Sequence, residues 1–480
     1  MELKPKAVFD YFAQINKVPR PSKHEEKMIE FLRQFAQDEG LAFKTDECGN
    51  VLISRPACPG LESKPTVVLQ AHMDMVCEKT SDCQIDFMND PIQSYIDGEW
   101  MRAKGTTLGA DDGIGIAMAM AVLTDKDLKL GPIECLFTRD EETGLTGAEA
   151  LESGFMTGKY LINLDSEDEG EIFIGCAGGV NTEIDFDYFN QEIPEGSVAL
   201  RVVIDKLVGG HSGDDINKNR ANANKLLARF LHDEFNKFDL NLISIDGGNL
   251  HNAIPRHAEA VIAVSDDIKH EVRADFNIFA ANVQNEYHRT EPTAEFTMES
   301  VEMPETCIDD ITAYNLIEAL HACHHGVYEW SQDIPNFVET SSNLASIKMP
   351  EEGKIKIVTS QRSSTQSQLE CMSSVIAATF TLAGADVTIH EGYPGWKPNP
   401  DSEILRLAVD KYVGLFGKQP KVRAIHAGLE CGLFSEKYQG LDMISVGPTL
   451  RGVHSPDERL EIATVDLVWR HLAAILEGIK

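Results

Sequence analysis

The segment that decides the fold runs from TVVLQAHMD at residues 66–74 to KYLINLDSED at residues 159–168. Between these two apolar runs lie GADDGIGIAMAMAVLTD at 109–125, typical of a loop that leads into a buried helix, and a third apolar run, PIECLFTRDEE at 132–142. Each apolar run has the length of a buried strand and ends in acidic residues. Strands that alternate with helices in this way predict an α/β domain with a largely parallel sheet.

The residues before this segment predict helices and a further strand. A helical pattern covers residues 5–16, and Ser22 and Glu25 have the spacing of a capping box before the amphipathic run KMIEFLRQFAQDEG. Gly40 is placed to end that second helix. NVLISR at 50–55 is a short apolar run typical of a strand.

The pattern changes near residue 182, where longer alternating segments such as SVALRVVID appear together with helix patterns. This is typical of an α+β insertion. A loop rich in proline and glycine, YPGWKPNPDS, begins near residue 393, and helices and strands follow it. We therefore expect a discontinuous catalytic domain at residues 1–181 and 393–480, with a mixed, mostly parallel sheet, interrupted by an inserted α+β domain at residues 182–392.

The composition is that of a folded globular protein. The chain has 480 residues, more than one hydrophobic core usually organises, with 42% hydrophobic and 25% charged residues. Lys and Arg total 43 against 77 Asp and Glu, a formal net charge of -34. Such a chain repels phosphate backbones and anionic membranes, so we expect neither nucleic acid nor a membrane as a partner.

The start of the chain and its cysteines indicate a cytoplasmic protein. No apolar run approaches the roughly 20 residues that cross a bilayer, and the start has no basic segment followed by an apolar stretch. The 10 cysteines include no CxxC pair. In a chain of this length, such spacing indicates reduced thiols and neither a disulfide framework nor a thiolate zinc site.

Acids or histidines follow the points where the predicted apolar strands end. Each taken alone is an ordinary turn or cap residue. Because ligands bind at the carboxyl ends of strands in open α/β sheets, the set predicts one shared site. Its members are His72 and Asp74, Asp111 and Asp112, Glu141 and Glu142, Asp165, and His454 in the late segment GVHSPDE.

Histidines and carboxylates without a thiolate suit zinc in a hydrolytic site, with manganese or cobalt as candidate substitutes. Asp74 comes two residues after His72, so in a strand both face the same side, and Asp74 can accept the other ring N–H of the histidine. The pair Glu141 and Glu142 permits one carboxylate to bind metal while the other takes a proton. The alternative for this pair is a charged surface loop.

Five motifs, in this order and at this spacing, resemble those of the M20 family of dinuclear zinc peptidases: HMD, GADDGIG, DEETG, NLDSE and GVHSPDE. Further segments resemble most closely the bacterial aminoacyl-histidine dipeptidases, or cytosol nonspecific dipeptidases, within that family. These segments are GGHSG, NLHNAIPR, TSQRSS and HAGLECG. The resemblance covers nearly the whole chain, and it implies that the inserted domain is a lid through which relatives often dimerise.

The resemblance also implies the metal ligands of two Zn²⁺ ions per chain. Asp111 would be the carboxylate shared by both ions. His72 and Asp165 would complete one metal site, and Glu142 and His454 the other.

The resemblance assigns the remaining catalytic roles within the same motifs. Glu141 would be the general base that activates a bridging hydroxide and later protonates the leaving amine. Asp74 would orient His72. Family members often carry Asn at the position of Asp112, and the extra charge here should alter the field of the site without abolishing metal binding.

In the lid, the resemblance implies a set of substrate-binding residues. His211 and Asn252 would hold the substrate carbonyl and carboxylate. Arg362 and the backbone around Gly428 would help to clamp the C-terminal end of the peptide. The alternatives are an ordinary loop histidine for His211 and a surface ion pair for Arg362.

The expected function is metal-dependent hydrolysis of unblocked dipeptides, with dipeptides that end in histidine as one candidate class. A second hypothesis is an M20-type amidohydrolase that removes the acyl group of N-acyl amino acids. A third is a metal-binding interaction protein that has lost catalysis, against which the intact Glu141 speaks. We expect a small peptide as the substrate and a homodimer formed through the lid.

Overall fold

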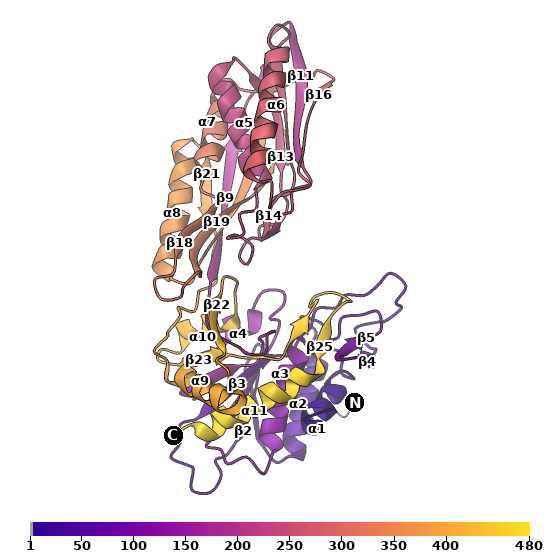
Figure 1. Ribbon diagram of the computed structural model, residues 1–480, viewed down its shortest axis with the longest axis vertical. Helices are drawn as coiled ribbons and strands as arrows, with labels where there is room; N and C mark the ends of the chain where they lie inside the picture. Colours follow the sequence, from indigo (N-terminus) through magenta and orange to yellow (C-terminus); the bar gives the residue numbers. More distant parts are fainter. Residues whose placement is uncertain (1–2) are drawn as a thin grey trace. The chain divides into compact units, whose positions relative to one another are not determined.

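The computed structural model describes residues 3–480, and the chain divides into two compact units, each with its own sheet (Figure 1). Unit 1 comprises Met1–Cys176, Trp396–Ala424 and Leu429–Lys480. Unit 2 comprises Ala177–Gly395 and Ile425–Gly428. The roles expected for them, catalysis for the first and a lid for the second, stay predictions.

Unit 1 is built on an eight-stranded mixed sheet with the order β1-β2-β6-β3-β7-β23-β8-β22. The central strands β6, β3, β7 and β23 run parallel, while β1, β2 and β8 pair antiparallel with their neighbours. The α/β fold class expected from the sequence is confirmed. The strands are β1 (Ala42–Thr45), β2 (Val51–Arg55), β3 (Val67–His72), β6 (Ile133–Thr138), β7 (Tyr160–Asn163), β8 (Glu171–Cys176), β22 (Lys421–Ile425) and β23 (Asp442–Ser445).

A small four-stranded sheet and several helices complete unit 1. The small sheet has the order β24-β25-β5-β4, with β4 (Ser94–Asp97), β5 (Trp100–Ala103), β24 (Leu450–Arg451) and β25 (Arg459–Glu461). The helices are α1 (Lys6–Ile15), α2 (Glu26–Asp38), α3 (Ala110–Thr124), α4 (Thr146–Ala150), α9 (Glu403–Phe416), α10 (Glu430–Lys437) and α11 (Ile462–Gly478).

Helix α3 is the buried helix expected after the GADDG loop. Every residue from 112 to 123 is buried. A helix that is apolar on all sides lies in the interior, and its first turn can therefore carry polar groups into the protein. Asp111 and Asp112 occupy that first turn with non-helical backbone angles, so the turn acts as a loop that presents their carboxylates.

The capping box expected at Ser22 and Glu25 is wrong. Helix α2 has no side-chain hydrogen bond at its N-cap, which is Glu25 itself. The Ser22 hydroxyl donates to Asp74 Oδ2 at 2.7 Å, and the Glu25 carboxylate accepts from Arg139 Nε at 2.5 Å. The other oxygen of Glu25 accepts from Lys23 N at 2.7 Å and not from Ser22 N, as a capping box requires. The local spacing of a capping motif carries no information about partners as distant in sequence as Asp74 and Arg139.

Unit 2 is an α+β unit with a nine-stranded sheet, as the change of pattern near residue 182 predicts. The order is β16-β11-β15-β13-β19-β20-β9-β21, with β18 beside β19. All pairings in this sheet are antiparallel. The strands are β9 (Gly178–Asp187), β11 (Ser197–Asp205), β13 (Asn241–Gly247), β15 (Ala258–Ser265), β16 (Glu295–Val301), β18 (Gly326–Trp330), β19 (Val338–Lys348), β20 (Lys354–Ser363) and β21 (Asp386–Ile389).

The helices of unit 2 are α5 (Ala223–Lys237), α6 (Lys269–Glu286), α7 (Asp310–Ala322) and α8 (Gln366–Leu382). One apolar core joins them to the sheet, with Phe230, Phe276 and Phe380 from the helices against Leu200 and Phe186 from the strands. Two short pairs, β10 (Asn190–Glu192) with β17 (Thr306–Ile308) and β12 (Gly210–His211) with β14 (Ala253–Ile254), lie outside the large sheet.

Within residues 3–480, no helix has both the length and the apolar character needed to cross a membrane. The cysteines, from Cys48 to Cys431, are all free thiols, which agrees with the reading of their spacing in the sequence.

Candidate active site

A cluster of carboxylates and histidines forms at the carboxyl edge of the parallel strands in unit 1. His72 is the last residue of β3, Glu141 and Glu142 follow the end of β6, and Asp165 follows the end of β7. Parallel neighbours end at the same edge of a sheet, so the alternation of strands and helices brings these side chains together.

Asp111 lies between the two histidines of the cluster. One oxygen, Oδ1, is 3.0 Å from His72 Nε2, and the other, Oδ2, is 3.1 Å from His454 Nε2. Each histidine nitrogen also faces a second carboxylate: His72 Nε2 is 3.5 Å from Asp165 Oδ1, and His454 Nε2 is 3.0 Å from Glu142 Oε2. The cluster therefore has two halves that share one carboxylate.

The carboxylates of this cluster favour positive charge on the two histidines. Hydrogen bonds to Asp111 and Glu142 raise the pKa of His454 to about 11. Burial raises the pKa of Asp165 to about 7, because its carboxylate faces others in a poorly solvated place. Against the cost of burial, hydrogen bonds to His454 and His72 hold the pKa of Asp111 below its usual value. The carboxylates thus require positive charge at both histidine nitrogens.

The residues of this cluster fit a pair of divalent cations. Ligand atoms of His72, Asp111 and Glu142 all lie within 4.8 Å of one another. Glu142 Oε1 is buried without a hydrogen-bond partner, which is costly for a carboxylate oxygen unless a cation completes its surroundings. Imidazole and carboxylate are ligands that zinc-class ions accept in hydrolytic sites.

Asp74 is fixed by four contacts and connects β3 to the turn after β6. Its Oδ1 is 3.2 Å from His72 Nδ1, as the spacing of the two residues predicts, and Oδ2 accepts from the Ser22 hydroxyl. It also accepts from the backbone N–H groups of Glu141, at 3.0 Å, and Glu142, at 3.2 Å. Although burial opposes ionisation, the hydrogen bonds and charge of His72 lower the pKa of Asp74 to about 2. Asp74 is therefore a constant anion that orients its neighbours.

Glu141 is held by its backbone, and no described interaction fixes its carboxylate. Burial, and then the nearby charges of Asp165 and Glu142, raise the pKa of Glu141 well above its usual value. A carboxylate in such a position has a high affinity for a proton, which suits a general base.

Asp112 follows Asp111 in the chain and is buried beside the cluster. Its Oδ1 accepts from Gly115 N at 3.1 Å, and Oδ2 is buried without a hydrogen-bond partner. Burial raises its pKa well above the usual value.

The sequence analysis missed three buried charged residues around the cluster. Glu430 starts α10, and its Oε2 accepts from Gln70 Nε2 at 2.6 Å and from the Thr138 hydroxyl at 2.8 Å. Glu458 and Arg20 are buried against the loop that carries Asp111. Two of these residues lie in motifs that carry the family resemblance: Glu430 in HAGLECG and Glu458 in GVHSPDE. Arg20 has no such motif.

A second cluster, in unit 2, contains the residues expected to bind substrate. His211 Nδ1 accepts the backbone N–H groups of Gly213 and Asp214, both at 3.2 Å. The proton of the neutral ring must therefore sit on Nε2, which is left as a donor. Burial, and then the charge of Arg362, lower the pKa of His211, so the ring stays neutral near pH 7.

Arg362 is buried in β20 and is not the surface ion pair of the alternative hypothesis. Its side chain donates to Tyr393 Oη at 2.9 Å and to Ser212 Oγ at 3.4 Å, and no described carboxylate pairs with it. Ser212 N in turn donates to Asn252 O at 2.8 Å. A Cβ at Gly428 would lie 2.8 Å from the Tyr393 ring, so glycine is required there. Tyr393 is a member that the sequence analysis missed.

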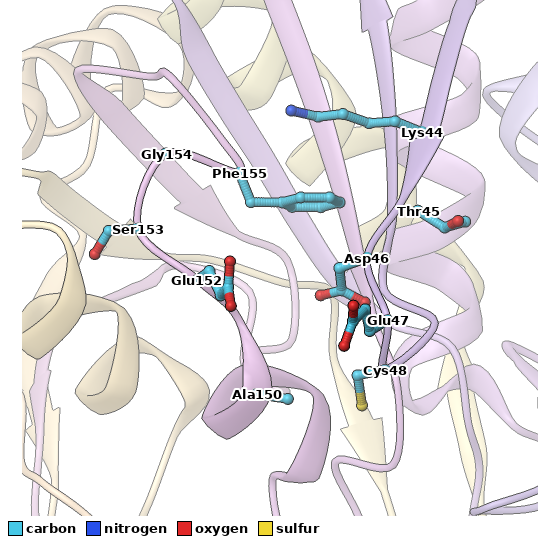
Figure 2. A pocket seen from close by; sticks show the side chains of 10 residues that line it. All are labelled: Lys44, Thr45, Asp46, Glu47, Cys48, Ala150, Glu152, Ser153, Gly154 and Phe155. Atoms are coloured by element: carbon cyan, nitrogen blue, oxygen red, sulfur yellow. The ribbon is translucent and has the colours of Figure 1, made fainter.

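A surface pocket of about 710 Å³ lies elsewhere in unit 1, between residues 44–48 and residues 150–155 (Figure 2). The Lys44 ammonium lies 4.6 Å from the centre of the Phe155 ring. The pocket shares no residue with the carboxylate and histidine cluster.

Comparison with known proteins gives consistent relationships. Residues 68–478 match the family model described as Peptidase family M20/M25/M40. The chain is 41% identical over 478 residues to the cytosol non-specific dipeptidase of Escherichia coli (strain K12), covering 100% of this chain and 98% of that protein. Its structure is similar to that of aminoacylhistidine dipeptidase from Vibrio alginolyticus, with a TM-score of 0.94, 43% identity and coverage of 100% and 97%. Aminopeptidase PepT from Bacillus cereus shares the fold at 17% identity, with a TM-score of 0.58 and 99% of each chain covered.

The buried Glu430 predicts how stability depends on pH. Burial raises the pKa of its carboxyl from 4.5 to about 8, so the folded protein keeps a proton that the unfolded chain loses. Its contribution to stability is therefore complete below about pH 4.5 and is lost as the pH rises through 8, by about 1.4 kcal/mol per pH unit at most. Glu430→Gln, which resembles the protonated carboxyl, should flatten this decline.

The measurement is chemical denaturation of metal-free protein at pH values from 5 to 9. Glu47→Gln is the control, because the Glu47 side chain is exposed, and it should keep the wild-type dependence. If Glu430→Gln and wild type lose stability in parallel over this range, the carboxyl of Glu430 is not protonated in the folded state.

Proposed function

Since the chain belongs to peptidase family M20/M25/M40, we propose that it is a metallopeptidase that hydrolyses unblocked dipeptides with two zinc ions bound per chain. The observation that carries the proposal is Asp111, whose two oxygens face His72 and His454. The similar proteins of Escherichia coli and Vibrio alginolyticus are named as dipeptidases. The Vibrio alginolyticus protein is named an aminoacylhistidine dipeptidase, which supports the proposal that dipeptides containing histidine are one class of substrate.

Each half of the cluster provides the proposed ligands of one metal ion. Asp111 is shared, His72 and Asp165 hold one ion, and Glu142 and His454 hold the other. When bound, the ions would polarise the substrate carbonyl and lower the pKa of a water molecule between them and the substrate. Manganese and cobalt accept the same nitrogen and oxygen ligands and are the candidate substitutes.

Glu141 is the proposed general base. Its carboxylate takes a proton from the water whose oxygen bonds to the carbonyl carbon, and it gives that proton to the leaving nitrogen as the C–N bond breaks. Asp74 supports this step, because it orients His72 through Nδ1 and holds the backbone N–H of Glu141. A single anion thus positions a ligand and the base.

The cluster of unit 2 is the proposed binding site for the carboxylate end of the substrate. Arg362 is a planar donor without a carboxylate partner among the described residues, which suits a bidentate contact with a C-terminal carboxylate. His211 offers Nε2–H to the substrate carbonyl, where negative charge develops in the reaction. Asn252 and the backbone at Gly428 complete this set.

We infer a cytoplasmic enzyme that acts as a homodimer through residues 182–392 and has no nucleic-acid or membrane partner. The net charge of -34 supports the last point.

Metal analysis of the purified protein together with a panel of dipeptides tests the proposal. We expect about two ions of the zinc class per chain, loss of activity on chelation and return of activity with Zn²⁺. Each dipeptide is paired with its N-acetyl form. Preference for the free amine supports the dipeptidase, preference for the acetylated form supports the deacylase, and absence of turnover in metal-loaded protein supports a non-catalytic role.

Replacing the base should separate catalysis from metal binding. Glu141→Gln should retain both ions, because Glu141 is not a proposed ligand, while kcat falls by about 10² to 10⁴. Glu142→Gln is the matched control at the neighbouring position, and it should lose metal as well as activity. The measurements are metal content and kcat. A Glu141→Gln variant with near-normal kcat contradicts the assignment of the base.

Replacing Arg362 should remove the preference for a free carboxylate at the dipeptide distance. Tripeptides and C-terminally amidated dipeptides should be cut poorly by wild type, because the charge is displaced or absent. Arg362→Ala should lower kcat/KM for the dipeptide about 10- to 100-fold, which is the effect of losing one charge-assisted contact. It should leave the poor rate on the amidated dipeptide almost unchanged. Equal losses on the two substrates would show that Arg362 does not bind the carboxylate.

A further inference from the structure

The carboxylate of Glu458 is saturated by the backbone of the loop that carries Asp111. Its Oε2 accepts from Leu108 N at 2.6 Å and Gly109 N at 3.0 Å, and its Oε1 accepts from Ala110 N at 2.8 Å and Asp111 N at 3.3 Å. The side chain is buried, with 2% of its surface exposed. With two N–H groups on each oxygen, Glu458 has no lone pair left for a metal ion. It can act on the site only through the loop.

Arg20 binds the same loop from the side of β3. Its Nη2 donates to Gly109 O at 2.5 Å, and its Nη1 donates to Met73 O at 3.1 Å and Asp74 O at 2.5 Å. The guanidinium is buried, and a Cβ at Gly109 would lie 2.7 Å from it, so the contact is close. Arg20 therefore joins the end of β3 to the turn at Gly109.

Together the two residues connect three segments that carry the proposed ligands. Glu458 is four residues after His454, and Glu458 N donates to Ser455 O at 3.0 Å, which closes the turn between them. The glutamate thus ties the His454 segment to the loop before Asp111, and Arg20 ties that loop to the segment of His72 and Asp74. The contacts of Asp111 with both histidines depend on where this loop lies.

We propose that Glu458, with Arg20, is a positioning residue that presets Asp111 between the two histidines and thereby sets the affinity of the metal site formed with Glu142 and His454. This inference rests on the proposed function, because it takes the ligand assignment from there. The site of His454 should be the more sensitive one, because Glu458 holds the His454 segment directly.

Glu458→Gln is the sharpest change. The amide has nearly the same shape, but its NH2 group would face two backbone N–H donors and leave them unsatisfied. The loop should then shift or loosen. Outer residues that orient metal ligands typically change metal affinity by about 10- to 100-fold, and we expect a loss of that size for one of the two ions.

The test is a titration of metal-free protein with Co²⁺, followed by visible absorption, and with Zn²⁺ in competition with a chromophoric chelator. Wild type should bind two equivalents tightly. Glu458→Gln should bind the first equivalent nearly as wild type does and the second about 10- to 100-fold more weakly, with an altered Co²⁺ spectrum. These readouts do not require turnover.

Glu134→Gln is the matched control. Glu134 is also a buried carboxylate of unit 1; its carboxylate accepts from Thr157 N at 2.7 Å and the Thr157 hydroxyl at 2.8 Å and makes no described hydrogen bond to a residue beside the proposed ligands. Glu134→Gln should lower the stability of the protein but leave its affinities for the first and second metal ions unchanged. If Glu458→Gln also loses stability but keeps both metal affinities, Glu458 only stabilises the fold and the inference is wrong.

The same titration distinguishes failure of this inference from failure of the proposed function. If Glu458→Gln does not fold, Glu458→Asp is titrated under the same criterion, because its shorter side chain keeps the charge but cannot reach both pairs of N–H groups. If wild type itself fails to bind two ions, the proposed function fails. If wild type binds two and both Glu458 variants match it, only the present inference fails.

Discussion

The site depends on one electrostatic constraint: carboxylates gathered in a poorly solvated place need positive charge between them. Asp111 satisfies it by facing His72 with one oxygen and His454 with the other. This constraint explains the direction of the pKa shifts. The pKa of His454 is raised to about 11, and the pKa of the buried Asp165 is raised to about 7. Without cations such a cluster favours protonation, and divalent ions would supply the positive charge in place of protons.

The surrounding structure fixes these charges by hydrogen bonds to backbone groups. Asp74 accepts the N–H groups of Glu141 and Glu142, Glu458 accepts those of residues 108–111, and Arg20 donates to carbonyls on two segments. Buried charges paired in this way are costly to disturb, because removing one partner leaves the other without compensation. These hydrogen bonds tie the loops to one another around the shared carboxylate.

The two units provide different chemistry. Unit 1 gathers anions and histidines that suit cations, whereas the cluster of unit 2 contains a buried arginine and a neutral histidine that suit an anion and a carbonyl oxygen. A peptide has both features, a scissile carbonyl and a terminal carboxylate. The buried guanidinium of Arg362 is thus a local positive charge in a chain whose net charge is -34.

The sequence by itself determined the α/β core, the strands that end in acids, the buried helix after GADDG and the identity of the clustered residues, because hydrophobic periodicity and strand order place the carboxyl ends of parallel strands together. It did not determine which long-range partners those residues would meet. Ser22 and Glu25 have the spacing of a capping box, yet in the structure the Ser22 side chain is hydrogen-bonded to Asp74 and the Glu25 side chain to Arg139. Arg20, Tyr393 and the role of Glu458 emerged only from the tertiary structure, because contacts between residues 31 to 350 positions apart leave no local pattern in the chain.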